Sequence, residues 1–218
     1  MKLVDLHTHS LLSDGVYFPM ELARRAQVKG YAVIAITDHV DTSNLSRVVP
    51  EVVKAAAESN RQVKEIRVIP GAEITHPPVG SIKGLVKEAR RLGAKMVLVH
   101  GESLAEPVTP GTNRKALEAG IDILAHPGLI SEEDFLFAKK QGVRLEVSAR
   151  KGHCLANGYL VGLWRRLGGQ LVIDTDSHQE NDFFTETKYF NVGMGAGLTR
   201  PEVAQILKST LAFAQTKL

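Results

Sequence analysis

The chain has 218 residues, 44% of them hydrophobic and 23% charged, which suffices for one globular domain with a full core, and we expect a single domain over residues 1–218. The formal net charge of +3 is too small to argue for nucleic-acid binding, and no apolar run approaches the ~18 residues of a membrane span. Since Cys154 is the lone cysteine and the N-terminus lacks a signal-peptide pattern, we expect a cytoplasmic protein without internal disulfides.

The first half of the chain predicts strands that alternate with helices. Strands are expected over 3–9, 32–37, 66–74 and 95–99, and helices over 19–29, 44–60 and 81–92. Pro19 fits the first turn of its helix, whereas Pro50 should kink or restart the second helix. Because Pro70 argues against a regular central strand, we expect the third strand to have an irregular end.

The second half continues the alternation. Strands are expected over 121–125 and 143–148 and from 171 onward, and helices over 113–119, 132–141, 157–167 and 200–215. Thr112, Ser131 and Thr199 are the predicted N-caps of three of these helices. Seven strand–helix units predict a parallel sheet, and a distorted (β/α)7 barrel fits best, with a doubly wound open sheet as the alternative.

Polar side chains that can bind metal follow the strands at their C-terminal ends. His7 and His9 project to one side of the first strand, because side chains alternate along a strand. The remaining candidates follow later strands and are Asp38, His39, Glu73, His100, His126, Asp176 and His178. In a barrel these ends meet at one mouth, where barrel enzymes place their chemistry. A histidine and carboxylate set without thiolate suits zinc, manganese or iron.

Seven short motifs resemble, in order, the motif series of the PHP (polymerase and histidinol phosphatase) family over residues 3–178. They are His7-Thr8-His9-Ser10, Ser13-Asp14-Gly15, Thr37-Asp38-His39, Gly71-Ala72-Glu73, the isolated His100, Ala125-His126-Pro127 and Asp176-Ser177-His178. The resemblance implies a PHP-type barrel and a site for three divalent metal ions.

The ligand sets that the resemblance implies are His7, His9, Glu73 and Asp176 for the first metal, Glu73, His100 and His126 for the second, and Asp14, His39 and His178 for the third. Glu73 would bridge the first two ions. Some members of the family have a histidine where Asp14 stands, so the third site would be richer in carboxylate here.

Further polar residues have two interpretations each. Asp5 and Asp174 share strand faces with ligands, so they either orient imidazoles or are buried acids bonded within the barrel. Asp38 is either such a partner or a proton donor. His76 and His153 fall outside the ligand pattern, and His76 is expected on a loop surface.

A phosphate-binding cluster is expected after the sixth strand, which carries no predicted ligand at its end. Arg150 is the first candidate for a catalytic and substrate-binding role, and Lys151 and His153 are lesser substrate-binding candidates. The 101–111 connection is long, and it and the glycine-rich stretch 193–197 are the two candidates for a rim over the site.

The resemblance and the ligand set together predict a phosphoric ester hydrolase. We expect hydrolysis of a phosphate ester of a small molecule, as in a histidinol phosphatase, by in-line attack of metal-bound hydroxide at a trinuclear site. The alternatives are a nuclease acting on nucleotide or oligonucleotide phosphodiesters, a non-catalytic metal-binding PHP module that serves a polymerase, and hydrolysis of a C–N bond. A compact domain without a basic tail or an aromatic platform favours the small substrate.

Overall fold

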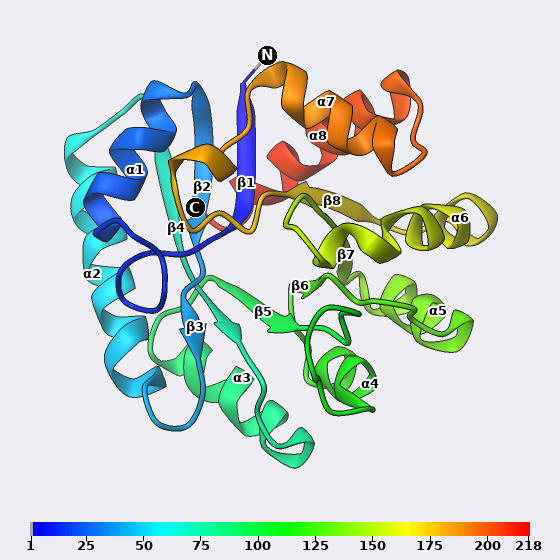
Figure 1. Cartoon of the computed structure of the whole chain (residues 1–218). Coiled ribbons are helices and arrows are strands. Elements are labelled where there is room, and N and C mark those ends of the chain that lie inside the picture. Colours follow the sequence, from blue (N-terminus) through cyan, green and yellow to red (C-terminus); the bar gives the residue numbers. More distant parts are fainter. Residues whose placement is uncertain (1) are drawn as a thin grey trace.

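The computed structural model describes residues 2–218, and parallel strands form its centre (Figure 1). The strands are β1 (Leu3–Thr8), β2 (Tyr31–Ile36), β3 (His39–Val40), β4 (Arg67–Ile74), β5 (Met96–His100), β6 (Ile123–Ala125), β7 (Arg144–Ser148) and β8 (Leu171–Asp174). Their order is β1-β2-β4-β5-β6-β7-β8, and β3 pairs with β4.

The sheet curves until β8 meets β1. A parallel bridge joins Thr8 to Ser177, and the amide of His9 donates to the carbonyl of Ser177 at 2.8 Å. The predicted barrel of seven parallel strands is therefore confirmed in a nearly closed form, and the open doubly wound sheet is wrong.

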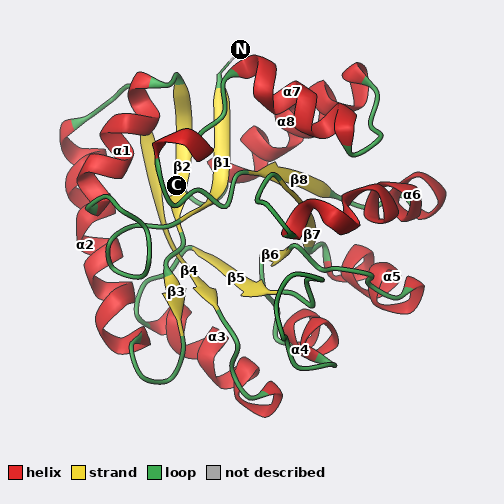
Figure 2. Ribbon diagram, in the orientation of Figure 1, coloured by secondary structure: helices red, strands yellow, loops and turns green. Residues whose placement is uncertain are grey.

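Helices cover the outside of the strands (Figure 2). They are α1 (Pro19–Val28), α2 (Leu45–Gln62), α3 (Ile82–Arg91), α4 (Thr112–Glu118), α5 (Glu132–Gln141), α6 (Asn157–Leu167), α7 (Glu186–Gly195) and α8 (Arg200–Gln215), with short 3-10 helices at η1 (Val79–Ser81), η2 (His153–Ala156) and η3 (Glu180–Asp182). Because the strands are covered on one side by helices and filled on the other by side chains, most of their residues are buried, as the continuous apolar sequences of β2 and β5 predict.

Two local predictions are corrected. Helix α2 continues through Pro50, so the predicted restart is wrong, while a kink there stays a prediction. The buried face, which includes Val48 and Val52, offsets the roughly 3 kcal/mol that an internal proline costs. Thr112 is the first residue of α4 rather than its N-cap: Gly111 holds the cap position with a φ of 91°, and the Thr112 hydroxyl donates to the carbonyl of Thr109 at 2.6 Å.

The third correction concerns Pro70. Strand β4 stays regular through this residue, and the irregularity lies in its neighbour instead. Ile36, the last residue of β2, pairs with Pro70 of β4. The strand is interrupted after Ile36, and β3 then continues the pairing with β4, with His39 beside Glu73. A Cβ on Gly71 would lie 2.7 Å from Thr37 Cγ2, so glycine permits the close approach at the break. The break brings His39 and Glu73 together at the mouth of the barrel.

Among residues 2–218, no helix has the length and the apolar character that crossing a membrane requires.

Candidate metal centre

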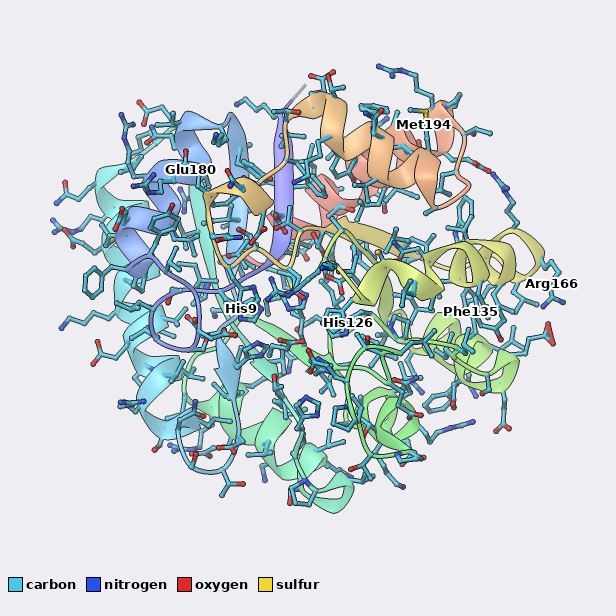
Figure 3. All side chains as sticks on the ribbon, in the orientation of Figure 1. His9, His126, Phe135, Arg166, Glu180 and Met194 are labelled. Atoms are coloured by element: carbon cyan, nitrogen blue, oxygen red, sulfur yellow. The ribbon has the colours of Figure 1, made fainter. Side chains whose placement is uncertain are left out.

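The predicted metal ligands converge at the C-terminal ends of the strands. Figure 3 shows His9 and His126 near the centre of the barrel mouth. Adjacent imidazoles touch in series: the ring centroids of His9 and His39 are 4.1 Å apart, those of His9 and His178 are 4.2 Å apart, and those of His100 and His126 are 4.3 Å apart. Residues more than 160 positions apart thus form one cluster.

The first group combines His7 and His9 of the first motif with two buried carboxylates. His9 Nε2 lies 3.1 Å from Asp176 Oδ1, and His7 Nε2 lies 3.2 Å from Glu73 Oε2. One ligand atom each from His7, His9 and Asp176 falls within 4.8 Å of the others. These distances are short enough for the side chains to share one ion.

The second group consists of Glu73, His126 and His100. Glu73 Oε1 lies 3.4 Å from His126 Nε2, whereas Oε2 faces His7 and His39. The carboxylate therefore has one oxygen toward each side of the cluster, as a bridging ligand requires. His100 adjoins His126 on the far side.

The third group lies at the solvent edge. His178 Nε2 is 3.1 Å from Asp14 Oδ2, and His39 Nε2 is 3.6 Å from Asp14 Oδ1. The Asp14 side chain is 54% exposed, whereas the carboxylates of the other groups are buried. A ligand entering from solvent would meet this group first.

The donor atoms fit metal ions because many of them lack any other partner. Within residues 2–218, the buried atoms without a hydrogen bond include His7 Nε2, both ring nitrogens of His9 and His126, both oxygens of Glu73, and Asp176 Oδ1. A buried polar atom left unpaired costs about 1–3 kcal/mol, so this many in one place points to a missing common partner. Divalent cations supply such a partner for nitrogen and oxygen together.

The cluster keeps its carboxylates ionised. Burial alone would raise the pKa of Glu73, but the charges of His7 and His39 hold it well below its usual range. The same opposition lowers the pKa of Asp176, where His7 is the main favourable neighbour. Burial lowers the pKa of His9 to about 3, and the neighbouring His39 adds to this effect. The site therefore offers ionised carboxylates together with a neutral imidazole at His9, and both are groups that bind divalent metal ions.

The sequence analysis missed a carboxylate behind the ligands. Glu146 Oε1 lies 2.8 Å from His7 Nδ1, and Glu146 Oε2 accepts the amide of His126 at 2.8 Å. This acid fixes the orientation of one imidazole and the backbone of another ligand. The signal in the sequence was an acid between the apolar residues Leu145 and Val147 of strand β7, where every residue is buried.

Asp5 and Asp174 contact no imidazole ring among the hydrogen bonds of the described residues. Asp5 accepts bonds from the Thr175 hydroxyl and amide, and Asp174 accepts the amide of Leu6 at 2.8 Å. Burial raises the pKa of Asp5 to about 7, and burial together with Asp5 raises that of Asp174 well above its usual range. Of the two interpretations, the buried acid that joins β1 to β8 fits these contacts.

Asp38 holds the loop that follows β1. Its oxygens accept the Ser10 amide and hydroxyl, each at 2.7 Å, and the Ser13 hydroxyl at 2.8 Å. Burial raises the pKa of Asp38, and the serine bonds oppose that rise. The loop so fixed carries Asp14 to the third group.

Arg150, the first candidate for a phosphate contact, lies beside the cluster. Its Nε is 3.6 Å from Asp176 Oδ2, and Nη1 donates to the Asp176 carbonyl at 3.2 Å. Arg150 and Lys151 line a cavity of about 490 Å³ at the mouth, together with Ala149, Thr175, Gln179, Asp182 and Lys188. Arg150 thus stands between the cluster and a space large enough for a small molecule.

His153 and His76 lie closer to the ligands than the sequence suggested. The His153 ring stacks on His126 with centroids 4.0 Å apart, and its Nε2 is 3.8 Å from Asp176 Oδ2. The His76 ring centroid is 4.7 Å from that of His100. Both residues lie next to turns, and His76 has a φ of 49°. The sequence does not reveal this backbone geometry.

Comparison with known proteins gives consistent results. The family model of the PHP domain matches residues 5–100. An uncharacterized protein of Methanocaldococcus jannaschii is 41% identical over 204 residues, which cover 93% of this chain and 94% of that protein. The DNA polymerase/3'-5' exonuclease PolX of Bacillus subtilis is 28% identical over 196 residues, which cover 80% of this chain but only 34% of the polymerase.

Two solved structures show the same fold. A protein in archaeal ribonuclease P with mature tRNA matches with a TM-score of 0.71 and 17% identity, over 98% of this chain and 90% of that one. Histidinol phosphate phosphatase from Lactococcus lactis, complexed with zinc, L-histidinol and phosphate, matches with a TM-score of 0.62 and 18% identity, over 91% of this chain and 95% of that one.

Proposed function

Because this chain belongs to the PHP family of metal-dependent phosphoesterases, we propose that it hydrolyses the phosphate ester of a small molecule, in the manner of a histidinol phosphatase. The observation that carries the proposal is the set of unpaired buried nitrogen and oxygen atoms that converge at the barrel mouth. The residues 1–218 act together as one domain in this proposal, since the cluster draws on strands from both halves of the chain.

The proposed site holds three divalent ions, of zinc, manganese or iron. The ligands are His7, His9, Glu73 and Asp176 for the first ion, Glu73, His100 and His126 for the second, and Asp14, His39 and His178 for the third. The two-sided contacts of Glu73 support a bridging role, and the contacts of Asp14 with two imidazoles support the third set.

Bound divalent ions lower the pKa of water and neutralise charge on a phosphoryl group. The chain itself supplies position and further charge. Arg150 places a guanidinium against the Asp176 edge of the cluster, where it can hold phosphate oxygens. Asp38 accepts three hydrogen bonds from Ser10 and Ser13, which support a role in holding the Asp14 loop rather than in proton donation.

The cavity beside Arg150 is the proposed seat of the organic part of the substrate. Lys151 lines it, which supports a second contact with an anionic substrate. His153 stacks on His126 and lies 3.8 Å from Asp176 Oδ2, so we expect it to support the metal ligands rather than to bind substrate in the cavity. A volume of about 490 Å³ accommodates a small phosphorylated molecule.

A nuclease is the second candidate, because the PolX relative carries an exonuclease in its name. The experiment that separates the candidates is a phosphate-release and product screen against small phosphomonoesters, phosphodiesters and short oligonucleotides, with Mn²⁺, Zn²⁺ and Fe²⁺ supplied separately. Turnover of a small monoester supports the proposal, whereas cleavage of oligonucleotides alone would replace it with the nuclease. A folded, metal-loaded protein that turns over none of these would favour the non-catalytic module.

Metal dependence is tested in the same screen. Chelation followed by dialysis should abolish activity, and added metal should restore it, because the ions supply both the attacking hydroxide and the neutralisation of phosphoryl charge in the proposed chemistry. Full turnover after verified removal of all metal would refute the proposed chemistry.

A further inference from the structure

The loop over residues 101–111 delivers a carboxylate to the edge of the second group. Glu106 Oε2 lies 3.1 Å from His100 Nε2 and 2.8 Å from His76 Nε2. Glu106 Oε1 lies 3.5 Å from His153 Nε2. One ligand atom each from His76, His100 and Glu106 falls within 4.8 Å of the others. A single acid therefore touches three imidazoles on the side of the cluster away from Glu73.

The hydrogen bonds of His100 determine which of its nitrogens faces Glu106. His100 Nδ1 lies 3.0 Å from the carbonyl oxygen of Gly101, which can only accept, so Nδ1 carries the proton. In the neutral imidazole that binds a metal ion, Nε2 then has the lone pair, and it faces a carboxylate oxygen at 3.1 Å. Two acceptors at this distance repel each other unless a cation lies between them.

The loop is packed so that it holds this position. The Glu102 side chain accepts the amides of Gly111 and Asn113, which ties the two ends of the loop together. A Cβ on Gly128 would lie 1.9 Å from the Glu102 carbonyl, so the loop rests directly on the turn after His126. Glu106 is 40% exposed, but the loop that carries it is anchored at both ends beside the cluster.

We propose that Glu106 is a further ligand of the metal ion bound by His100 and His126, and that His76 is a positioning residue that donates a hydrogen bond to Glu106. The inference rests on the proposed metal site, and it adds a carboxylate that closes the solvent side of the second ion. Glu106 Oε2 has two lone pairs, one for the His76 N–H and one for the ion. His76 thereby acts on the metal through the carboxylate, as outer partners of metal ligands do.

The test is metal binding to the full chain, without any phosphate ester. The variants Glu106→Gln and His76→Ala are compared with wild type by competition with a chromophoric chelator and by elemental analysis, and Co²⁺ absorption reports the coordination of each site. We expect Glu106→Gln to lower the affinity of one ion by about tenfold or more and to change the Co²⁺ spectrum, with a smaller loss in His76→Ala. The other two ions should bind as in wild type.

Two control variants separate ligation from damage to the fold. Leu104→Ala alters an exposed residue of the same loop, and Glu118→Gln removes the charge of an exposed acid on α4. Both should bind metal as wild type does. Wild-type affinity and spectrum in Glu106→Gln would overturn the proposal, and so would an equal loss in Leu104→Ala, which would assign the effect to loop packing.

The measurements distinguish a failure of the metal-ligand proposal from a failure of the proposed phosphoesterase function. If Glu106→Gln keeps every metal affinity but raises KM for a phosphate ester, the residue faces substrate and the ligand proposal is overturned. If the wild type binds the ions but hydrolyses no phosphate ester, the proposed function fails, while the titration of Glu106→Gln still decides the role of this residue.

Discussion

Glu146 provides the sharpest test of how the chain supports its metal ligands. This acid lies behind the cluster, with one oxygen 2.8 Å from His7 Nδ1 and the other accepting the His126 amide. The variant Glu146→Gln keeps the shape of the side chain and one acceptor oxygen but removes the negative charge. Loss of such a partner weakens metal binding or activity by roughly 10- to 100-fold, equivalent to about 1.4–2.7 kcal/mol.

The electrostatics of His7 give the direction of the effect. Burial alone would lower the pKa of His7, but the charges of Glu73, Glu146 and Asp176 raise it well above its usual value. Removing one of these charges makes the imidazole a weaker base and therefore a weaker ligand. In Glu146→Gln we expect the affinity of the ion bound by His7 to fall, with kcat falling in parallel.

The assay is chelator competition with purified protein, combined with steady-state kinetics on the best substrate of the screen. Urea unfolding of each variant checks that the fold is intact, and Glu146→Asp keeps the charge while shortening the reach. Glu118→Gln is the matched control, because its exposed carboxylate lies on α4 and pairs with Lys115. A folded Glu146→Gln protein with wild-type affinity and kcat would refute the view that His7 needs this partner.

Three further predictions follow from the contacts. Arg150→Ala should lower kcat/KM for a phosphate substrate by about 10- to 100-fold in steady-state assays, with Arg150→Lys intermediate, and an unchanged value for every substrate would exclude a phosphate contact. Because the folded-state pKa of Asp174 is raised above 3.8, its contribution to stability is complete below about pH 4 and is lost as pH rises. Asp174→Asn cannot ionise, so in urea unfolding of metal-free protein it should gain stability relative to wild type from about pH 4 to pH 7, and a difference that is constant with pH would contradict this. Gly128→Ala would place a Cβ 1.9 Å from the Glu102 carbonyl at a φ of 61°, so we expect about 2 kcal/mol or more of destabilisation by thermal or urea unfolding, and a neutral effect would show that the loop moves freely.

The barrel and its ligand positions were predictable because both follow from local sequence patterns. Alternating apolar strands and helices specify parallel strands, and polar residues directly after strands must meet at one mouth. His7, Glu73 and His126 were found this way. Glu146 was not, because it lies inside a strand, and its partners are set by the register and curvature of the barrel rather than by its neighbours in sequence.

The residues at the edge of the site were harder to predict, since loop geometry places them. His76 has a positive φ of its own, and its ring lies beside that of His100. Glu106 lies near His100 because Glu102 anchors the loop that carries it. Helix α7 was missed as well, because Gly193 and Gly195 weaken the helical pattern. Gly193 fits there since a Cβ would lie 2.5 Å from Val203 of α8, so close packing between the two helices selects glycine.

The junction between β8 and β1 has a consequence for how the protein opens. The Thr8–Ser177 bridge, its neighbouring amide bonds and the side-chain bonds of Asp5 and Asp174 join this seam. The residues on either side of it include His7, His9, Asp176 and His178. Ions bound there would fasten the two ends of the sheet across a long loop of chain, much as a cross-link does. Amide hydrogens along the seam should therefore exchange faster in the apoprotein than after metal is added, and the proposed metal centre would then also stabilise the closure of the barrel.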